Sequence, residues 1–239
     1  YEVDRIEPEI ATIQDFSDSE GILKLAEKCN GSGDCRKPVE AGGTMCPSYR
    51  ATKDEKDTTR ARANTLREFL TNSKEVNKFN HKELKQVFDL CLSCKACASE
   101  CPSNVDIATM KAEFLYQYQE ANGYSFRNRL FANNAKYNKL GSYLPNITNF
   151  FTNSTLAKKV LGVAVERSVP KLANQTLESW LKKHHPKTAK KAVYLFNDEF
   201  TNFYDAEIGI DAVILLEKLG YEVKNIAHDE SGRSHISKG

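Results

Sequence analysis

Residues 91–102 read CLSCKACASECP, and this run is the most informative part of the sequence. Its cysteines are Cys91, Cys94, Cys97 and Cys101, and Pro102 follows directly. Three thiolates separated by two residues each can wrap around one face of a cubane, so that each sulfur reaches a different iron. The proline then turns the chain away after the fourth cysteine. The spacing therefore predicts a segment that binds a 4Fe–4S cluster.

Zinc is the alternative metal for such a run. Structural zinc sites usually come as two separated CxxC pairs that give four tetrahedral ligands. A zinc-stabilised module would dock a partner rather than carry electrons. We favour iron and sulfide because the run has the bacterial ferredoxin spacing, in which the fourth cysteine binds the other cluster of two-cluster proteins.

A second group of cysteines precedes this run. Cys29 and Cys35 enclose the residues NGSGD, and Cys46 stands before Pro47. Ser32 occupies the position at which a ferredoxin run would have its second cysteine. If the two segments exchange their fourth ligands, Cys46 completes the cluster of the later run.

The same exchange leaves a second site with only three thiolates. Cys101 would join Cys29 and Cys35 there. This site could hold a three-iron cluster, a four-iron cluster with an oxygen ligand on one iron, or no cluster. Ser32 and Asp34 are the local oxygen candidates, although Ser32 can equally serve the turn.

The composition is that of an ordinary soluble globular protein, with 40% hydrophobic and 28% charged residues among 239. A net charge of +2 gives no electrostatic reason to expect nucleic acid. No run approaches the roughly 18 apolar residues of a membrane-spanning helix. The seven cysteines are odd in number and crowded together, which is a poor disulfide framework. We expect a protein of the reducing cytoplasm, with a peripheral position at the inner membrane as an alternative.

The hydrophobic periodicity predicts a mainly α fold. Helices are expected over 20–28, 60–70, 81–90, 105–118, 126–140, 156–165 and 172–183. Two short β-prone runs, 192–196 and 221–226, flank a predicted helix over 205–219, which makes one βαβ unit. Because a single unit cannot bury both faces of a sheet, we expect the start of a truncated α/β domain.

These patterns divide the chain into four parts. Residues 1–19 are an acidic linker or the tail of a missing domain, and 20–122 form a helical domain around the cysteines. Residues 123–190 are a helical extension, and 191–239 begin the α/β domain.

Several arginines lie close to the cysteine segments in the sequence. Arg50, Arg60, Arg62 and Arg67 could contact an anionic substrate or a cofactor phosphate, but arginines on solvated helix faces are more common. The glycines of the first segment could bring backbone N–H groups close to cluster sulfurs, and such hydrogen bonds help to set a reduction potential.

Three segments carry a resemblance to a known family. They read CNGSGDCRK, GGTMCPSYRATKDEKDTTRARANTLREFL and CLSCKACASECPSNVDIATMKAEFL. Over about residues 16–238 the chain resembles the C-terminal region of bacterial FAD-linked oxidase and Fe–S oxidoreductases. These join a flavin domain to a helical ferredoxin domain and a CCG-type α/β domain. The chain is similar, more distantly, to the Fe–S subunits of glycolate oxidase, anaerobic glycerol-3-phosphate dehydrogenase and heterodisulfide reductase.

The resemblance implies an electron relay. In that family the flavin domain oxidises D-2-hydroxy acids such as D-lactate or D-2-hydroxyglutarate, and the clusters carry the electrons onward. The implied partners are a flavin domain with FAD, in the same polypeptide or in a partner subunit, and an acceptor that is a quinone, a carrier protein or a thiol system. The alternative is a free-standing Fe–S subunit. Neither the flavin domain nor the CCG cysteines occur in these residues, so only the seven cysteines carry over as site residues.

Overall fold

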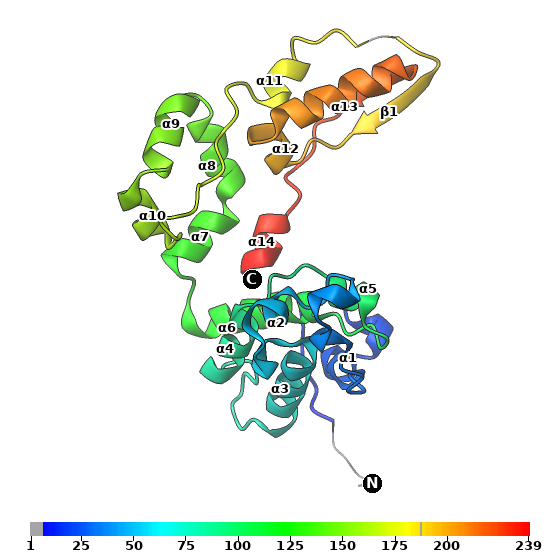
Figure 1. Ribbon diagram of the computed structural model, residues 1–239, viewed down its shortest axis with the longest axis vertical. Helices are drawn as coiled ribbons and strands as arrows, with labels where there is room; N and C mark the ends of the chain where they lie inside the picture. Colours follow the sequence, from blue (N-terminus) through cyan, green and yellow to red (C-terminus); the bar gives the residue numbers. More distant parts are fainter. Residues whose placement is uncertain (1–6, 187) are drawn as a thin grey trace. The chain divides into compact units, whose positions relative to one another are not determined.

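The computed structural model describes residues 7–186 and 188–239, and it is mainly helical (Figure 1). The chain divides into two compact units. The first runs to Ser125 and includes Ile236–Gly239, and the second comprises Phe126–His235. The prediction of a mainly α fold is confirmed.

The first unit contains all seven cysteines and a core of packed helices. Its α-helices are α1 (Ile22–Glu27), α2 (Pro47–Thr52), α3 (Thr59–Asn72), α4 (Lys82–Asp89), α5 (Ala96–Glu100) and α6 (Ile107–Asn122). Helix α3 packs against α1 and α4, and α5 packs against α6. Periodicity did not predict the short helices α2 and α5: α2 directly follows Cys46, and α5 lies within the later cysteine run and contains Cys97.

Local sequence explains where the two long helices begin. Thr58 caps α3 by accepting a hydrogen bond from the Ala61 N–H at 2.9 Å. Asp106 caps α6 in the same way, through the Thr109 N–H at 3.1 Å. Both helix N-termini are thereby fixed beside the cysteine segments.

The core of this unit uses one face of α6, the helix predicted over 105–118. Ile107, Met110 and Phe114 are fully or almost fully buried, and Tyr118 packs against their edge. The Phe114 ring lies 5.1 Å from that of Phe88 on α4 and is nearly parallel to it. This packing holds the loop between α4 and α5, which carries the cysteine run, against a rigid support.

The second unit starts with a group of short helices. They are α7 (Phe126–Ala132), α8 (Asn134–Gly141), α9 (Pro145–Thr152), α10 (Thr155–Leu161) and α11 (Leu177–Leu181). The helix predicted over 126–140 is broken at Asn133, whose side chain donates to the Arg129 carbonyl at 2.9 Å. Asparagine competes for backbone groups in this way, which is why it tends to end helices.

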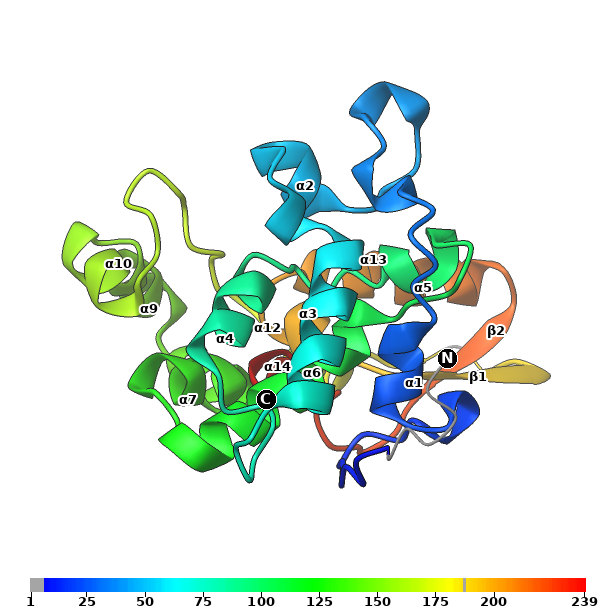
Figure 2. The same ribbon diagram turned by 90° about the horizontal axis from the view of Figure 1, so that it is seen from below.

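The second unit also contains the predicted βαβ unit. Strands β1 (Lys191–Leu195) and β2 (Tyr221–Asn225) pair in parallel, with Val193 opposite Val223 (Figure 2). The connection contains α12 (Glu199–Phe203) and α13 (Ala206–Lys218). Helix α13 passes close to Leu177, because a Cβ on Gly209 would lie 2.3 Å from the Leu177 side chain.

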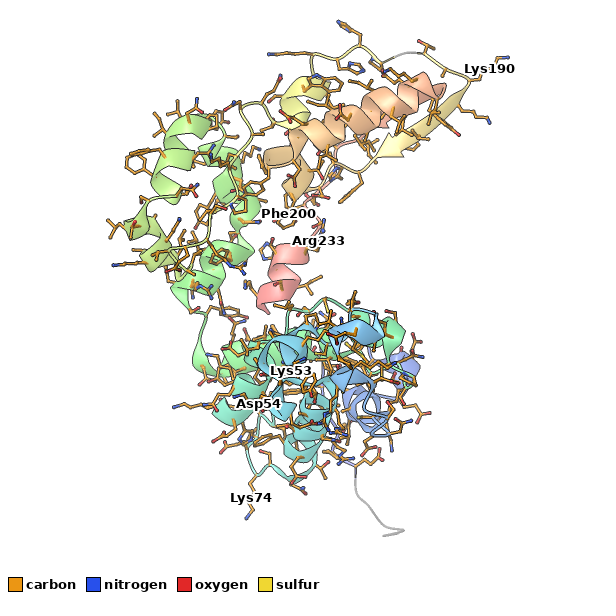
Figure 3. All side chains as sticks on the ribbon, viewed as in Figure 1. Lys53, Asp54, Lys74, Lys190, Phe200 and Arg233 are labelled. Atoms are coloured by element: carbon orange, nitrogen blue, oxygen red, sulfur yellow. The ribbon has the colours of Figure 1, made fainter. Side chains whose placement is uncertain are left out.

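The loops after the two strands are joined by polar contacts. Glu199 accepts from the Ser231 N–H and hydroxyl at 3.0 and 2.7 Å. Arg233 pairs with Asp198 at 3.1 Å and lies over the Phe200 ring, with 5.1 Å to its centroid (Figure 3). Arg233 begins the last helix, α14 (Arg233–Lys238). Ser231 and Arg233, which follow β2, are thus bound to Glu199 and Asp198, which follow β1.

Among the residues that the structure describes, no helix has both the length and the apolar character needed to cross a bilayer.

Candidate iron–sulfur centre

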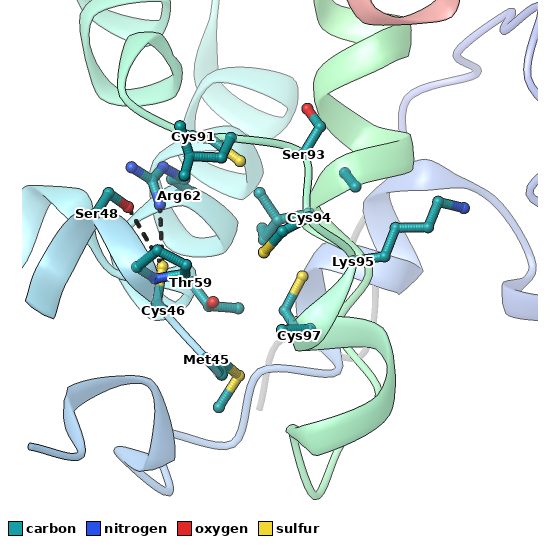
Figure 4. A pocket seen from close by; sticks show the side chains of 15 residues that line it. Met45, Cys46, Ser48, Thr59, Arg62, Cys91, Ser93, Cys94, Lys95 and Cys97 are labelled. Atoms are coloured by element: carbon teal, nitrogen blue, oxygen red, sulfur yellow. Dashed lines mark hydrogen bonds between the residues drawn. The ribbon is translucent and has the colours of Figure 1, made fainter. Parts of the chain in front are cut away.

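A pocket in the first unit brings the two cysteine segments together (Figure 4). Four cysteines line it, three from the later run and one from the earlier segment: Cys91, Cys94, Cys97 and Cys46. Thiols from both cysteine segments therefore face one pocket, where they can bind one shared cofactor.

The backbone of the later run makes this arrangement possible. Ser93 and Lys95 both adopt left-handed conformations, with φ of 53° and 61°. For residues other than glycine such angles are uncommon and cost about 1 kcal/mol each. The two reversals turn the chain tightly between Cys91 and α5. Three sulfurs consequently face one side of the loop, as the ferredoxin spacing requires.

Cys46 reaches the pocket from the start of α2, where it is 7% exposed. Its sulfur lies 3.4 Å from Nη1 of Arg62 and 3.4 Å from the Ser48 hydroxyl, as the dashed lines in Figure 4 show. A guanidinium donates to a thiolate more strongly than to a neutral thiol. Arg62 thus places a positive charge beside the Cys46 sulfur.

Arg62 is the most deeply buried charge beside the pocket, since its residue surface is 0% exposed. Its Nε donates to the Val87 carbonyl at 2.9 Å, and its Nη1 also donates to the Asp57 carbonyl at 2.7 Å. The Asp57 carboxylate lies 3.7 Å from Nη2, too far for a hydrogen bond. Nη2 has no hydrogen-bond partner in the structure. A buried cation with spare donor capacity fits an anionic cluster as its neighbour.

A second cation stands near Cys91. Nζ of Lys111 donates to the Cys91 carbonyl at 2.5 Å, and burial lowers the pKa of this lysine while the nearby Cys91 thiolate raises it. Lys111 therefore fixes the first residue of the run, and its charge adds to that of Arg62.

Backbone N–H groups at two helix N-termini act on the pKa values of two cysteines. Burial raises the pKa of Cys97 to about 12, while the Ile107 and Ala108 N–H groups at the start of α6 pull it down. Burial also raises the pKa of Cys35, while the N–H of Arg60 at the start of α3 lowers it. Without metal these thiols keep their protons, so binding of iron has to displace them.

The donor set and the pocket together test which metal fits. A tetrahedral zinc site with Zn–S distances of about 2.3 Å needs its sulfurs about 3.8 Å apart. Among the described residues, no three His, Cys, Asp or Glu side chains gather closely enough to hold one metal ion. A cubane places iron and sulfide between its thiolates, so it fits sulfurs that surround a wider space.

The remaining cysteines lie outside this pocket. Cys29 follows α1, Cys35 is buried in a 3₁₀ turn, and Cys101 ends α5. Burial is the main cause of the raised pKa of Cys35, and negative charge on Cys46 and Cys29 adds to it.

The two oxygen candidates of the earlier segment have other roles in the structure. Ser32 is exposed in a loop, where its N–H donates to the Asn30 side chain at 3.1 Å. The Asp34 carboxylate pairs with Lys37 at 2.8 Å.

Sequence reasoning missed a clamp on the loop before Cys46. The carboxylate of Glu100, on α5, accepts from the Thr44 N–H at 2.8 Å, from the Thr44 hydroxyl at 2.5 Å and from the Met45 N–H at 3.0 Å. These bonds lower the pKa of Glu100 to about 2. Arg50 holds the same loop by donating to the carbonyls of Gly43 and Gly42 at 2.8 and 2.7 Å. The residue before Cys101 therefore positions the segment that ends in Cys46.

The four arginines near the cysteine segments have different roles in the structure. Arg62 contacts a cysteine and Arg50 holds a loop, whereas Arg60 pairs with Glu55 at 2.7 Å and Arg67 is exposed. The packing of helix faces decides these roles, and spacing alone does not reveal them.

The comparisons with known proteins agree with this chemistry. Residues 28–106, which include all seven cysteines, match the family described as a 4Fe–4S dicluster domain. That match establishes 4Fe–4S as the class of cofactor.

Three relatives are D-2-hydroxyglutarate dehydrogenases. The chain is 29% identical to that of Escherichia coli strain K12, over 90% of the chain and 26% of the relative. It is 27% identical to that of Pantoea ananatis, over 90% and 26%, and 26% identical to that of Haemophilus influenzae, over 91% and 26%. The chain thus spans about a quarter of the length of these relatives. No solved structure matches it.

Proposed function

We propose that the chain is the iron–sulfur electron-transfer module of a FAD-dependent oxidoreductase that oxidises a D-2-hydroxy acid. One observation carries the proposal: cysteines from two separate segments line one pocket, within residues that match a 4Fe–4S dicluster domain. The relatives support the class of enzyme, since they are D-2-hydroxyglutarate dehydrogenases.

Four cysteines hold the first cluster in this proposal: Cys46, Cys91, Cys94 and Cys97. When bound, such a cluster accepts and donates single electrons. Arg62 and Lys111 offset its negative charge, and the buried helices around it exclude water. The N–H groups of Ile107 and Ala108 donate to the Cys97 sulfur and stabilise it as a thiolate.

Cys29, Cys35 and Cys101 form the second site of the proposal. Three thiolates suit a three-iron cluster, or a four-iron cluster that takes an oxygen ligand on one iron. The description of the matching family as a dicluster domain supports a second cluster.

The proposed partners follow from the chemistry of a hydroxy acid. Its oxidation releases two electrons and two protons, and a flavin accepts both electrons before clusters carry them singly. We therefore propose a flavin domain as the donor, in the same polypeptide or in a partner subunit. The acceptor is a quinone, a carrier protein or a thiol system.

The proposal also includes a domain organisation and a location in the cell. The helical cluster domain of residues 20–122 and the extension of 123–190 precede the α/β domain that begins at 191. Cluster ligands of this kind suit the reducing cytoplasm.

The test uses the longest polypeptide of the reading frame, together with the flavin domain. Anaerobic addition of D-2-hydroxyglutarate or D-lactate should bleach the flavin and then the thiolate-to-iron absorption. Cys94→Ala should leave the bleaching of the flavin intact and abolish reduction of the first cluster. Flavin that reduces an acceptor equally fast in this variant and in the unaltered protein would contradict the relay.

A further inference from the structure

Helix α9 of the second unit has its apolar side chains on the outside. Ile147, Phe150 and Phe151 are 53%, 74% and 62% exposed, and they fall on one face at intervals of three and four residues. Tyr143 and Leu144, just before the helix, extend this face and are 75% and 62% exposed. A helix on the surface of a soluble protein normally presents the opposite face to water.

The inward face of α9 is polar. Asn149 donates to the Leu172 carbonyl at 2.9 Å and accepts from the Leu172 N–H at 2.8 Å. The Thr148 hydroxyl donates to the Gly141 carbonyl at 3.0 Å, and Asn153, which follows the helix, accepts from the Val169 N–H at 3.0 Å. These bonds hold α9 in this orientation. The exposed apolar face is therefore a built feature of the unit and does not result from a loose helix.

Neighbouring helices add to this surface. Helix α10 packs against α9 (Figure 1). It exposes Leu156 and Val160, and α8 exposes Leu140. Exposed apolar side chains gathered in one part of a soluble protein mark an interaction site. We call the apolar face of α9 with these neighbours the α9 surface.

The segment that carries the α9 surface contains basic residues but no acidic ones. Residues 126–165 contain six basic side chains and no Asp or Glu. The basic residues are Arg127, Arg129, Lys136, Lys139, Lys158 and Lys159. In the whole chain acidic and basic residues are nearly equal, with 32 and 34. Forty residues without a carboxylate thus stand apart from the rest of the sequence.

We propose that the α9 surface binds the face of a membrane that contains anionic phospholipids. Short helices with outward aromatic and aliphatic residues and a cationic surround are typical of segments that lie flat in the interface. The negative potential of an anionic leaflet attracts lysine and arginine and repels carboxylates. A protein partner of mixed charge would not require a carboxylate-free segment. The proposal does not depend on the clusters, so it stands or falls separately from the proposed function.

The experiment measures binding of the chain to lipid vesicles by sedimentation. It uses the whole chain, and the longer polypeptide where the reading frame extends it. One set of vesicles contains phosphatidylglycerol and phosphatidylcholine, and the other contains phosphatidylcholine alone. We expect at least tenfold stronger binding to the anionic vesicles, weakening as salt is raised because the attraction is screened.

Two variants separate the parts of the proposal. Phe150→Ser with Phe151→Ser removes the outward aromatic pair and leaves Asn149 and Thr148 in place. This variant should lose binding at least tenfold. Lys136→Gln with Lys139→Gln should weaken binding several-fold at low salt and have little effect at high salt, where charge is already screened.

A matched control comes from α13, where Ile208 and Leu215 are 67% and 57% exposed. Ile208→Ser with Leu215→Ser removes equally exposed apolar side chains outside the carboxylate-free segment, and it should bind vesicles like the unaltered chain. Circular dichroism confirms that each variant keeps its helices. Equal binding to both vesicle types, or binding that the phenylalanine pair does not change, would overturn the proposal. So would self-association through this face, seen as a larger species that the same pair abolishes without any vesicle binding.

Discussion

The two groups of cysteines differ in what surrounds them. Cys46, Cys91, Cys94 and Cys97 line one pocket, with the buried Arg62 donating to the first of them. Cys29, Cys35 and Cys101 lie outside that pocket, and the exposed loop between Cys29 and Cys35 has a serine in place of a cysteine. A cluster site therefore needs more than thiolates: it also needs a shaped space, a compensating charge and loops fixed by their own hydrogen bonds.

The largest effect expected from this comparison concerns the two cysteine groups themselves. Cys94→Ala should remove most of the thiolate-to-iron absorption and of the reduced-state EPR signal of the first site. Cys35→Ala is the matched control, because it removes a thiol of the second group and should leave the first signal in place. Full retention of the signal in Cys94→Ala would defeat the ligand assignment.

Restoring the missing cysteine should change the second site. Ser32→Cys supplies a fourth thiolate at the ferredoxin position. The iron content should rise toward that of two four-iron clusters, and any three-iron signal in the oxidised protein should disappear. Ser32→Ala is the control. An unchanged iron content in Ser32→Cys would mean that the second group does not assemble a cluster.

Arg62 should influence the potential of the first site only. One unit charge at about 4–8 Å in an effective dielectric constant of about 20 contributes about 2–4 kcal/mol. Arg62→Met should therefore lower the one-electron potential by on the order of 100 mV, because the added electron loses a nearby positive charge. Redox titration followed by EPR measures this shift.

Arg62→Lys is the matched control for that measurement. Arg62→Lys keeps the positive charge and should keep most of the potential. Arg62→Met removes the charge and also leaves Asp57 buried without its cation. Equal potentials in Arg62→Met and in the unaltered chain would mean that Arg62 does not influence the first cluster.

The smallest effect expected is at the clamp of the Cys46 loop. Glu100→Gln keeps the shape of the side chain but replaces a charged acceptor of three hydrogen bonds. The first cluster should be lost a few times faster to an iron chelator. Glu40→Gln, an exposed residue near the same loop, is the control. Identical loss rates in the two variants would show that Glu100 does not position Cys46.

The sequence allowed the cysteine segments and most long helices to be predicted. Periodicity predicted the helix over 105–118, which is α6, and the two β-prone runs around a helix predicted the parallel pair β1 and β2. These features depend on local spacing, which a single sequence records directly.

Other features depend on packing between distant segments. Arg62 and Lys111 lie on helix faces, and only the folded arrangement shows that they point to Cys46 and Cys91. Helix α9 was not predicted, and the sequence alone does not show that its apolar face points outward while Asn149 holds its polar face. Glu100 contacts a loop that is more than fifty residues away in the sequence.

The most direct test of the central claim is the metal content of the chain reconstituted without oxygen. The account predicts iron together with acid-labile sulfide, about four of each for the first cluster. Zinc in place of iron, or iron without sulfide, would contradict it.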